Sequence, residues 1–263
     1  MDFHRADMPF VSIRNGELSY SIEGSGEPLI LLTGFGSDKD FWNSLVPVLS
    51  SDFTVIAVDN RGSGDTVCDG TFSIDDMADD VICLLDSLSF GKAHILGWSM
   101  GSQIAQSVAI RYTERVRTLT LVSSYFRRPE RSAFMLDGMM EAVENGMPLK
   151  YLGVPLIAMG FPESHFASKK REIPESLNAD IDGMRNQMNA VNAYTTKGKI
   201  ELMDTPVLSI HGIKDYMVPA DMGDELADSI KNCVKVRFED EGHNILPLRY
   251  ADRLKEFLTD HPI

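Results

Sequence analysis

The chain has 263 residues, of which 43% are apolar and 24% charged, a balance that excludes a disordered or fibrous protein and suffices for one hydrophobic core. It carries 39 acidic against 25 basic residues, a formal net charge of −14, so we expect neither nucleic-acid nor anionic-membrane binding. Because it lacks both an apolar run of the roughly 18–20 residues that a membrane span needs and a basic-then-apolar leader, we expect a cytoplasmic protein.

Strand-like and helix-like segments alternate along the chain, which is typical of a mostly parallel sheet with helices on both faces. Residues 10–14 and 17–22 alternate polar and apolar side chains around an Asn-Gly pair, a pattern that predicts a β-hairpin. The last strand is predicted at 234–238. Apolar runs that suit strands buried on both faces lie between these, at 28–32, 54–58, 93–96, 119–122 and 206–210.

Helices are predicted between these strands. Apolar residues at helical spacing indicate amphipathic helices at 74–88, with Ser73 as the N-cap, and at 248–257, whereas the uncharged segment 100–110 predicts a helix enclosed by protein. Residues 125–200 break the alternation, because they are helix-like throughout and hold seven of the fourteen methionines. We therefore predict a doubly wound α/β core, residues 1–124 and 201–263, with a helical cap, residues 125–200, inserted after the sixth strand.

Cofactor and metal patterns are missing from the sequence. Its three cysteines are widely spaced, without a disulfide or metal-ligand spacing, so we interpret them as free thiols. The glycines at 24–26 precede a strand rather than a helix, which argues against a phosphate-binding loop. We expect no metal and no cofactor.

A G-x-S-x-G motif occupies residues 97–101, between a predicted strand and the uncharged helix. In such a context the two glycines permit a sharp turn, which would place the Ser99 hydroxyl at the carboxyl edge of the sheet and at a helix N-terminus. A serine hydroxyl is a poor nucleophile unless a base takes its proton, and the oxyanion that forms needs hydrogen-bond donors. The motif therefore predicts that Ser99 is a nucleophile with a base nearby.

The partners of Ser99 are expected in the chain order nucleophile, acid, base. Of the six histidines, only His243 lies on the loop after the last predicted strand, so it is the predicted base. Asp215, on the loop after the strand at 206–210, is the predicted acid. His94 and His211 lie in or at the end of strands, and we interpret both as structural.

Taken together, these segments resemble the α/β-hydrolase superfamily along the whole chain. Residues 31–36, LLTGFG, are similar to the family's oxyanion loop, and residues 59–64, DNRGSG, to its glycine-rich turn. The resemblance implies that the backbone N–H groups of Phe35 and Met100 form the oxyanion hole. Thr33 departs from the family, which commonly has histidine at its place.

Four residues are predicted to line the substrate pocket. Trp98 flanks the nucleophile and Val218 follows the acid in sequence. Met135 and Met139 belong to the methionine-rich insert, whose flexible thioether side chains suit a surface that accommodates varied apolar groups.

A serine nucleophile favours a carboxylesterase that acts on small to medium acyl esters through an acyl-enzyme. Other enzyme activities also stay open. The G-x-S-x-G motif at 97–101 is similar to that of pimeloyl-carrier-protein methyl ester esterases, and its Ser-Met-Gly part is shared by enol-lactonases. A thioesterase would fit the same residues. A third possibility belongs to another class, since residues 34–38 with Trp42 resemble a loop of the bacterial stress regulator and of the plant karrikin and strigolactone receptors, which sense ligands. The turnover rate on an ester would distinguish them, because a receptor would hydrolyse its ligand slowly and an enzyme would turn over many times.

The charge is unevenly distributed. The insert 125–200 holds ten basic and nine acidic residues, so its net charge is +1 and the rest of the chain carries −15. Arg127, Arg128 and Arg131 form one basic cluster and residues 169–171, Lys-Lys-Arg, another. Positive charge near the site would attract an anionic substrate or an acidic acyl carrier protein to the cap. We otherwise expect a small-molecule ester as substrate and either a monomer or a homodimer.

Overall fold

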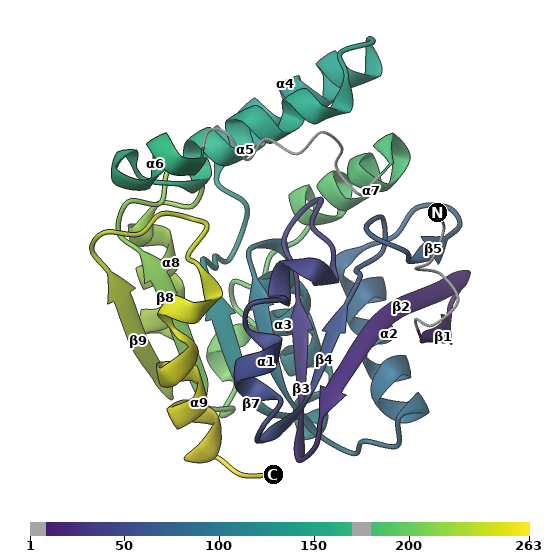
Figure 1. The fold of residues 1–263 in the computed structure, drawn as a ribbon, viewed down its shortest axis with the longest axis vertical. Helices are drawn as coiled ribbons and strands as arrows, with labels where there is room; N and C mark the ends of the chain where they lie inside the picture. The colour runs from purple at the N-terminus through teal and green to yellow at the C-terminus, as the bar shows by residue number, and fades with distance from the viewer. Residues whose placement is uncertain (1–8, 170–179) are drawn as a thin grey trace.

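The structure of the protein is a computed structural model that describes residues 9–169 and 180–263. Its centre is a sheet with the strand order β1-β2-β4-β3-β6-β7-β8-β9, in which β5 pairs with β2 (Figure 1). The strands are β1 (Phe10–Ile13), β2 (Gly16–Gly24), β3 (Glu27–Leu32), β4 (Phe53–Val58), β5 (Val67–Cys68), β6 (Ala93–Trp98), β7 (Val116–Val122), β8 (Val207–Gly212) and β9 (Cys233–Phe238). The neighbouring strands β4, β3, β6, β7, β8 and β9 all pair in parallel, so the predicted mostly parallel sheet is confirmed.

The predicted hairpin forms at the start of the chain, but its turn lies one residue earlier than predicted, at Arg14 and Asn15, because Gly16 already belongs to β2. β1 and β2 pair antiparallel with Ile13 opposite Gly16, and Asn15 has a φ of 58°, the left-handed conformation that such a two-residue turn requires. The predicted strand count is one too low, because β5 has only two residues, too few to produce a pattern, and pairs with β2 at Gly16 and Glu17. The helical insert therefore follows the seventh strand, not the sixth.

The helices begin and end at α1 (Val46–Leu49), α2 (Ile74–Ser87), α3 (Met100–Arg111), α4 (Glu130–Glu144), α5 (Gly153–Gly160), α6 (Glu163–Lys169), α7 (Ile181–Asn192), α8 (Ala220–Ser229) and α9 (Ala251–Thr259). Ser73 caps α2 as predicted, in a capping box with Asp76. Helix α3 is buried from Met100 to Ala109, as its lack of charge predicts. The final helix begins at Ala251 rather than at 248, because residues 247–249 form a separate 3₁₀ turn.

Alternate residues of the buried strands face opposite layers of helices. In β3, Ile30 and Leu32 pack in a cluster with α2, α3 and α8, whereas Leu29 and Leu31 pack in a second cluster with α1 and α9. Figure 1 shows these helices on the two sides of the sheet. The continuous apolar runs of the sequence follow from this two-sided burial.

Helices α4 to α7 lie beyond the carboxyl ends of the parallel strands (Figure 1). Helices α4, α5 and α7 contribute to a third apolar cluster, which includes Leu136 and Met140 of α4 and Met184 and Met188 of α7 and reaches the body at Met217. The division of the chain into a core and a cap with the boundaries given above stays a prediction. In the part of the chain that the structure describes, no helix combines the length and the apolar character of a membrane span.

A buried ion pair anchors the glycine-rich turn at 59–64. Arg61 donates to both carboxylate oxygens of Asp80 on α2, at 2.6 and 2.7 Å, and each side chain is only 4% exposed. Burial opposes the charge of Arg61, but the hydrogen bonds and charge of Asp80 outweigh it and raise the pKa of the guanidinium. The pair therefore ties the turn after β4 to the helix that packs behind it.

Removing the carboxylate of this pair is expected to destabilise the fold. Asp80→Asn should lower the free energy of unfolding by about 3–5 kcal/mol, because it leaves a buried guanidinium without its counter-charge. The matched control is Asp86→Asn on the same helix, whose ion pair with Arg115 is 2.6 Å long but whose carboxylate is 63% exposed. That control should lose less than about 1 kcal/mol. Urea unfolding curves measure both, and equal small losses would contradict the argument.

Candidate active site

Ser99 lies on a strained turn between β6 and α3. Its φ of 54° and ψ of −118° are unusual for a residue with a side chain. A Cβ at Gly97 would lie 2.2 Å from the carbonyl oxygen of Gly101, and a Cβ at Gly101 would lie 2.2 Å from that of Leu32. Both motif positions therefore require glycine for a steric reason, and the turn holds the hydroxyl at the N-terminus of α3.

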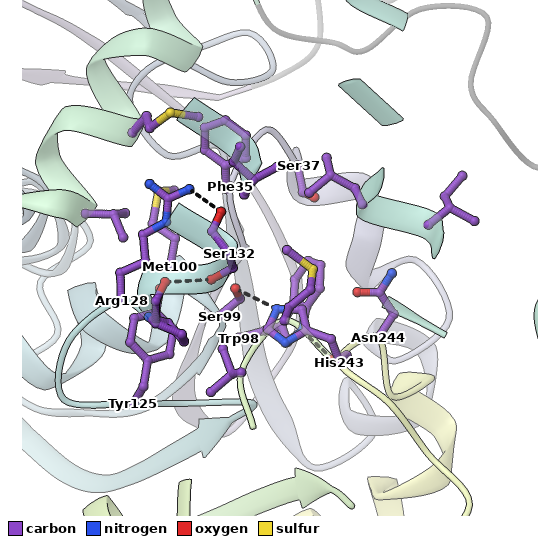
Figure 2. A pocket seen from close by; sticks show the side chains of 18 residues that line it. Phe35, Ser37, Trp98, Ser99, Met100, Tyr125, Arg128, Ser132, His243 and Asn244 are labelled. Atoms are coloured by element: carbon purple, nitrogen blue, oxygen red, sulfur yellow. Dashed lines mark hydrogen bonds between the residues drawn. The ribbon is translucent and has the colours of Figure 1, made fainter. Parts of the chain in front are cut away.

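The structure brings the three residues predicted as nucleophile, acid and base into one hydrogen-bonded series. His243 Nε2 lies 2.8 Å from Ser99 Oγ (Figure 2). On the other side of the ring, His243 Nδ1 lies 2.8 Å from Asp215 Oδ2. An ionised carboxylate only accepts hydrogen bonds, so Nδ1 carries the proton and Nε2 is free to accept one from the hydroxyl. The loops after β6, β8 and β9 supply the three side chains.

Asp215 is held as a carboxylate by its surroundings. Its Oδ1 accepts hydrogen bonds from the N–H groups of Met217 and Val218, at 2.8 and 2.7 Å. Burial alone would raise the pKa of Asp215, but electrostatic interactions and hydrogen bonds with His243 and His211 lower it to about 2. His211, interpreted from the sequence as structural, thus also lies against the acid, with its Nε2 3.3 Å from Asp215 Oδ2.

Phe35 and Met100 both line the cavity in front of Ser99. Their backbone N–H groups donate to no other described residue, as an oxyanion hole requires. Thr33 is buried and serves the loop itself: its hydroxyl donates to the carbonyl oxygen of Ser37 at 2.9 Å and accepts from Asn60 at 3.2 Å. The hydroxyl of Thr33 therefore has hydrogen-bond partners as both donor and acceptor, and these bonds stabilise the loop.

Gln187 of α7 links the insert to the same loop. Its Oε1 accepts from the N–H of Gly36 at 2.9 Å, and its Nε2 donates to the carbonyl oxygen of Arg61 at 2.8 Å and to Ser63 Oγ at 2.7 Å. The side chain is fully buried. Sequence reasoning missed it, although its helical spacing to Met184 and Val191 signals a polar residue on an apolar face.

A cavity of about 130 Å³ opens beside Ser99 (Figure 2). Of the four predicted pocket residues, Trp98 and Val218 line it, whereas Met135 and Met139 do not and border a separate surface hollow beside Phe134. The prediction was wrong for these two because the buried face of α4 is formed by Ser132, Leu136 and Met140, which are four residues apart. Met135 and Met139 each precede one of these residues and so point in another direction. The cap residues that do line the cavity include Ser132, Leu136, Leu156, Ile157, Met188 and Val191.

The predicted basic cluster at 127–131 is divided by the structure. Arg128 is buried in the cavity wall, whereas Arg127 is exposed and pairs with Glu130 at 3.5 Å, and Arg131 is exposed. Lys170 and Arg171 of the second cluster lie outside the described residues. The acidic acyl carrier as a partner therefore stays a prediction.

One group of side chains within the described ranges has metal-ligand spacing, His165 with Asp240 and Glu241. Both carboxylates already pair with Arg249, at 3.1 and 2.9 Å. Because that arginine supplies the counter-charge, the cluster is explained as an ion-pair network.

The fold and the arrangement of the site define an α/β hydrolase. A family model described as the alpha/beta hydrolase fold matches residues 27–154, and this is the fold that the motifs predict. It is similar to carbamate hydrolase RutD of Variovorax paradoxus, with 26% identity over 82% of this chain and 85% of that protein. It is also 27% identical to a pimeloyl-[acyl-carrier protein] methyl ester esterase of Neisseria meningitidis, over 85% of this chain and 89% of the relative. A thermophilic esterase of Thermogutta terrifontis has the same fold, with a TM-score of 0.87, 24% identity and coverage of 97% and 99% of the two chains.

Proposed function

We propose that the protein is a serine hydrolase that cleaves carboxylic esters of small to medium acyl groups. The observation that carries the proposal is the series Ser99, His243 and Asp215, joined by two 2.8 Å hydrogen bonds at the wall of a cavity. The reaction would begin when His243 Nε2 takes the Ser99 proton and Oγ attacks the ester carbonyl carbon. The N–H groups of Phe35 and Met100 would hold the oxyanion, each contributing about 3–4 kcal/mol to the transition state.

The imidazolium then gives its proton to the leaving alcohol oxygen, which leaves an acyl group on Ser99. A water molecule, activated by the same His243 nitrogen, releases the acid and restores the hydroxyl. Asp215 holds the imidazole tautomer and stabilises its charged form, and no step needs a cofactor. The cavity of about 130 Å³ supports a small acyl group, since a dry cavity of about 150 Å³ accommodates benzene.

Steady-state kinetics on p-nitrophenyl esters from acetate to octanoate test the proposal. We expect many turnovers per enzyme molecule and a fall in kcat/KM for the longest acyl chains. Release of a single equivalent of nitrophenol, with no further turnover, would instead favour the ligand-sensing reading. A short lactone and a thioester in the same panel separate the other readings left open by the sequence.

Carbamate hydrolysis is a second candidate, favoured by the relatives named carbamate hydrolase RutD, of which one covers 82% of this chain. The same serine and histidine would attack a carbamate carbonyl. Comparing methyl carbamate with methyl acetate decides between the two, because a carbamate hydrolase should prefer the former.

The contact between Gln187 and the oxyanion loop leads to a prediction for activity. Gln187→Ala should lower kcat on esters by about 10- to 100-fold, because the N–H of Gly36, next to Phe35, loses its only described partner and a small misplacement of donors is costly. Asn186→Ala, one residue earlier on α7, is the control: its side chain is half-buried and donates to the carbonyl oxygen of Gly70, away from the oxyanion loop. Equal activity of the two variants would contradict the role of Gln187.

A further inference from the structure

The wall of the cavity holds a buried arginine that the reaction does not use. Arg128 lies on the segment between β7 and α4, and its side chain is only 8% exposed. Among the described residues that line the cavity, it is the only one with a permanent charge. In Figure 2, Arg128 lies on one side of Ser99 and His243 on the other. A substrate bound at Ser99 would therefore lie beside a cation.

The guanidinium of Arg128 is only partly satisfied within the protein. It donates to Asn192 Oδ1, and at 3.4 Å to the carbonyl oxygen of Ser132, so the described residues use only part of its five N–H donors. Its nearest carboxylate, Asp137, is 3.5 Å away and 44% exposed. A buried cation with so little hydrogen bonding is costly unless another anion completes its shell.

Arg61 and Arg128, whose side chains are 4% and 8% exposed, differ in this respect. Arg61, bound by both oxygens of Asp80, has a raised pKa, whereas burial lowers the pKa of Arg128 because it outweighs the effects of Tyr125 and Asp137. Arg61 forms a two-hydrogen-bond ion pair with Asp80 that holds the turn at 59–64 against α2. Arg128 has only a 3.5 Å ion pair with the half-exposed Asp137, and it lines the cavity where substrate would bind.

We propose that Arg128 binds a carboxylate carried by the substrate, so that the enzyme acts on small esters or lactones with a second, anionic end. The inference rests on the proposed function and narrows its substrate class. A planar carboxylate matches the guanidinium fork, and one negative charge balances one buried positive charge. The cavity of about 130 Å³ limits the substrate to a short dicarboxylic acid derivative.

The test compares pairs of esters that differ only in charge. Monomethyl succinate, glutarate and adipate are each paired with the neutral methyl ester in which an isopropyl group replaces the carboxylate, and methanol release gives kcat/KM. We expect the unmodified enzyme to prefer the anionic ester of at least one pair. In Arg128→Gln the ratio of anionic to neutral kcat/KM should fall by about 10- to 150-fold, the loss expected for a hydrogen bond to a charged group.

Two further variants keep the test independent of general damage. Arg127→Gln removes the adjacent but exposed arginine and should leave the ratio unchanged. Asp137→Asn removes the half-exposed competing carboxylate and should raise the ratio by about 2- to 5-fold. A ratio that does not change in Arg128→Gln, or that falls equally in Arg127→Gln, overturns the proposal, and so does an unmodified enzyme that prefers every neutral ester.

A binding measurement separates failure of this inference from failure of the proposed function. Monomethyl glutarate is titrated calorimetrically into Ser99→Ala and into Ser99→Ala combined with Arg128→Gln. Weaker binding to the double variant by at least tenfold supports the role of Arg128 even if no ester is turned over. Equal binding to both overturns it even if the protein proves to be an efficient esterase.

Discussion

Replacing Ser99 by alanine is expected to lower kcat on p-nitrophenyl esters by about six orders of magnitude, the loss that follows removal of a serine nucleophile from such a site. The hydroxyl is the only one that His243 Nε2 contacts among the described residues. Alanine adopts the same backbone conformation with the same strain, so the free energy of unfolding should change little. Steady-state kinetics and urea unfolding measure the two quantities.

The matched control for this prediction is Ser102→Ala. Ser102 lies three residues further along, in α3, and its hydroxyl donates to the carbonyl oxygen of Ser99 at 2.6 Å rather than facing the cavity. Most of the activity should therefore remain. Substantial ester turnover by Ser99→Ala would exclude this serine as the nucleophile.

Asp215→Asn is expected to lower kcat by about 10⁴-fold with little change in KM. The reason lies in the loop around the side chain. The N–H groups of Met217 and Val218 need an acceptor, so the amide oxygen must take the place of Oδ1, and the amide NH₂ must face His243 Nδ1. That donor favours the tautomer with its proton on Nε2, which cannot accept the proton of Ser99.

Asp240→Asn is the control for the acid. Asp240 lies three residues before His243 in the chain, but its carboxylate is 57% exposed and pairs with Arg249. Because it contacts Arg249 rather than the imidazole, its loss should leave kcat nearly unchanged. A larger loss in Asp240→Asn than in Asp215→Asn would show that the acid has been misassigned.

Much of the fold and the central part of the site could be predicted because their signals are local. The apolar runs predict buried strands, and Gly97 and Gly101 surround Ser99 at a strand-to-helix turn where no larger residue fits. Loops that follow neighbouring parallel strands meet at one sheet edge, which is why Asp215 and His243 could be identified from the sequence. The strand count was wrong by one because two residues, β5, carry no pattern.

The structure of the insert at 125–200 could be predicted only in outline. Helical spacing shows that α4 has an apolar stripe, but not which way that stripe is turned relative to the body, so Met135 and Met139 were placed in a cavity that Ser132 and Leu136 in fact line. Side chains one residue apart on a helix point about 100° apart, and the choice between them depends on packing.

The sequence by itself determined the α/β-hydrolase fold and the three residues of the hydrogen-bonded series, since Ser99 lies in a local motif and Asp215 and His243 lie on loops that follow predicted strands. Only the tertiary structure decided what surrounds them. Arg127 and Arg128 are indistinguishable as sequence, yet one is exposed and the other is buried in the cavity wall. The difference arises because burial and counter-charge depend on α4 and α7, which contact the segment only after the chain has folded.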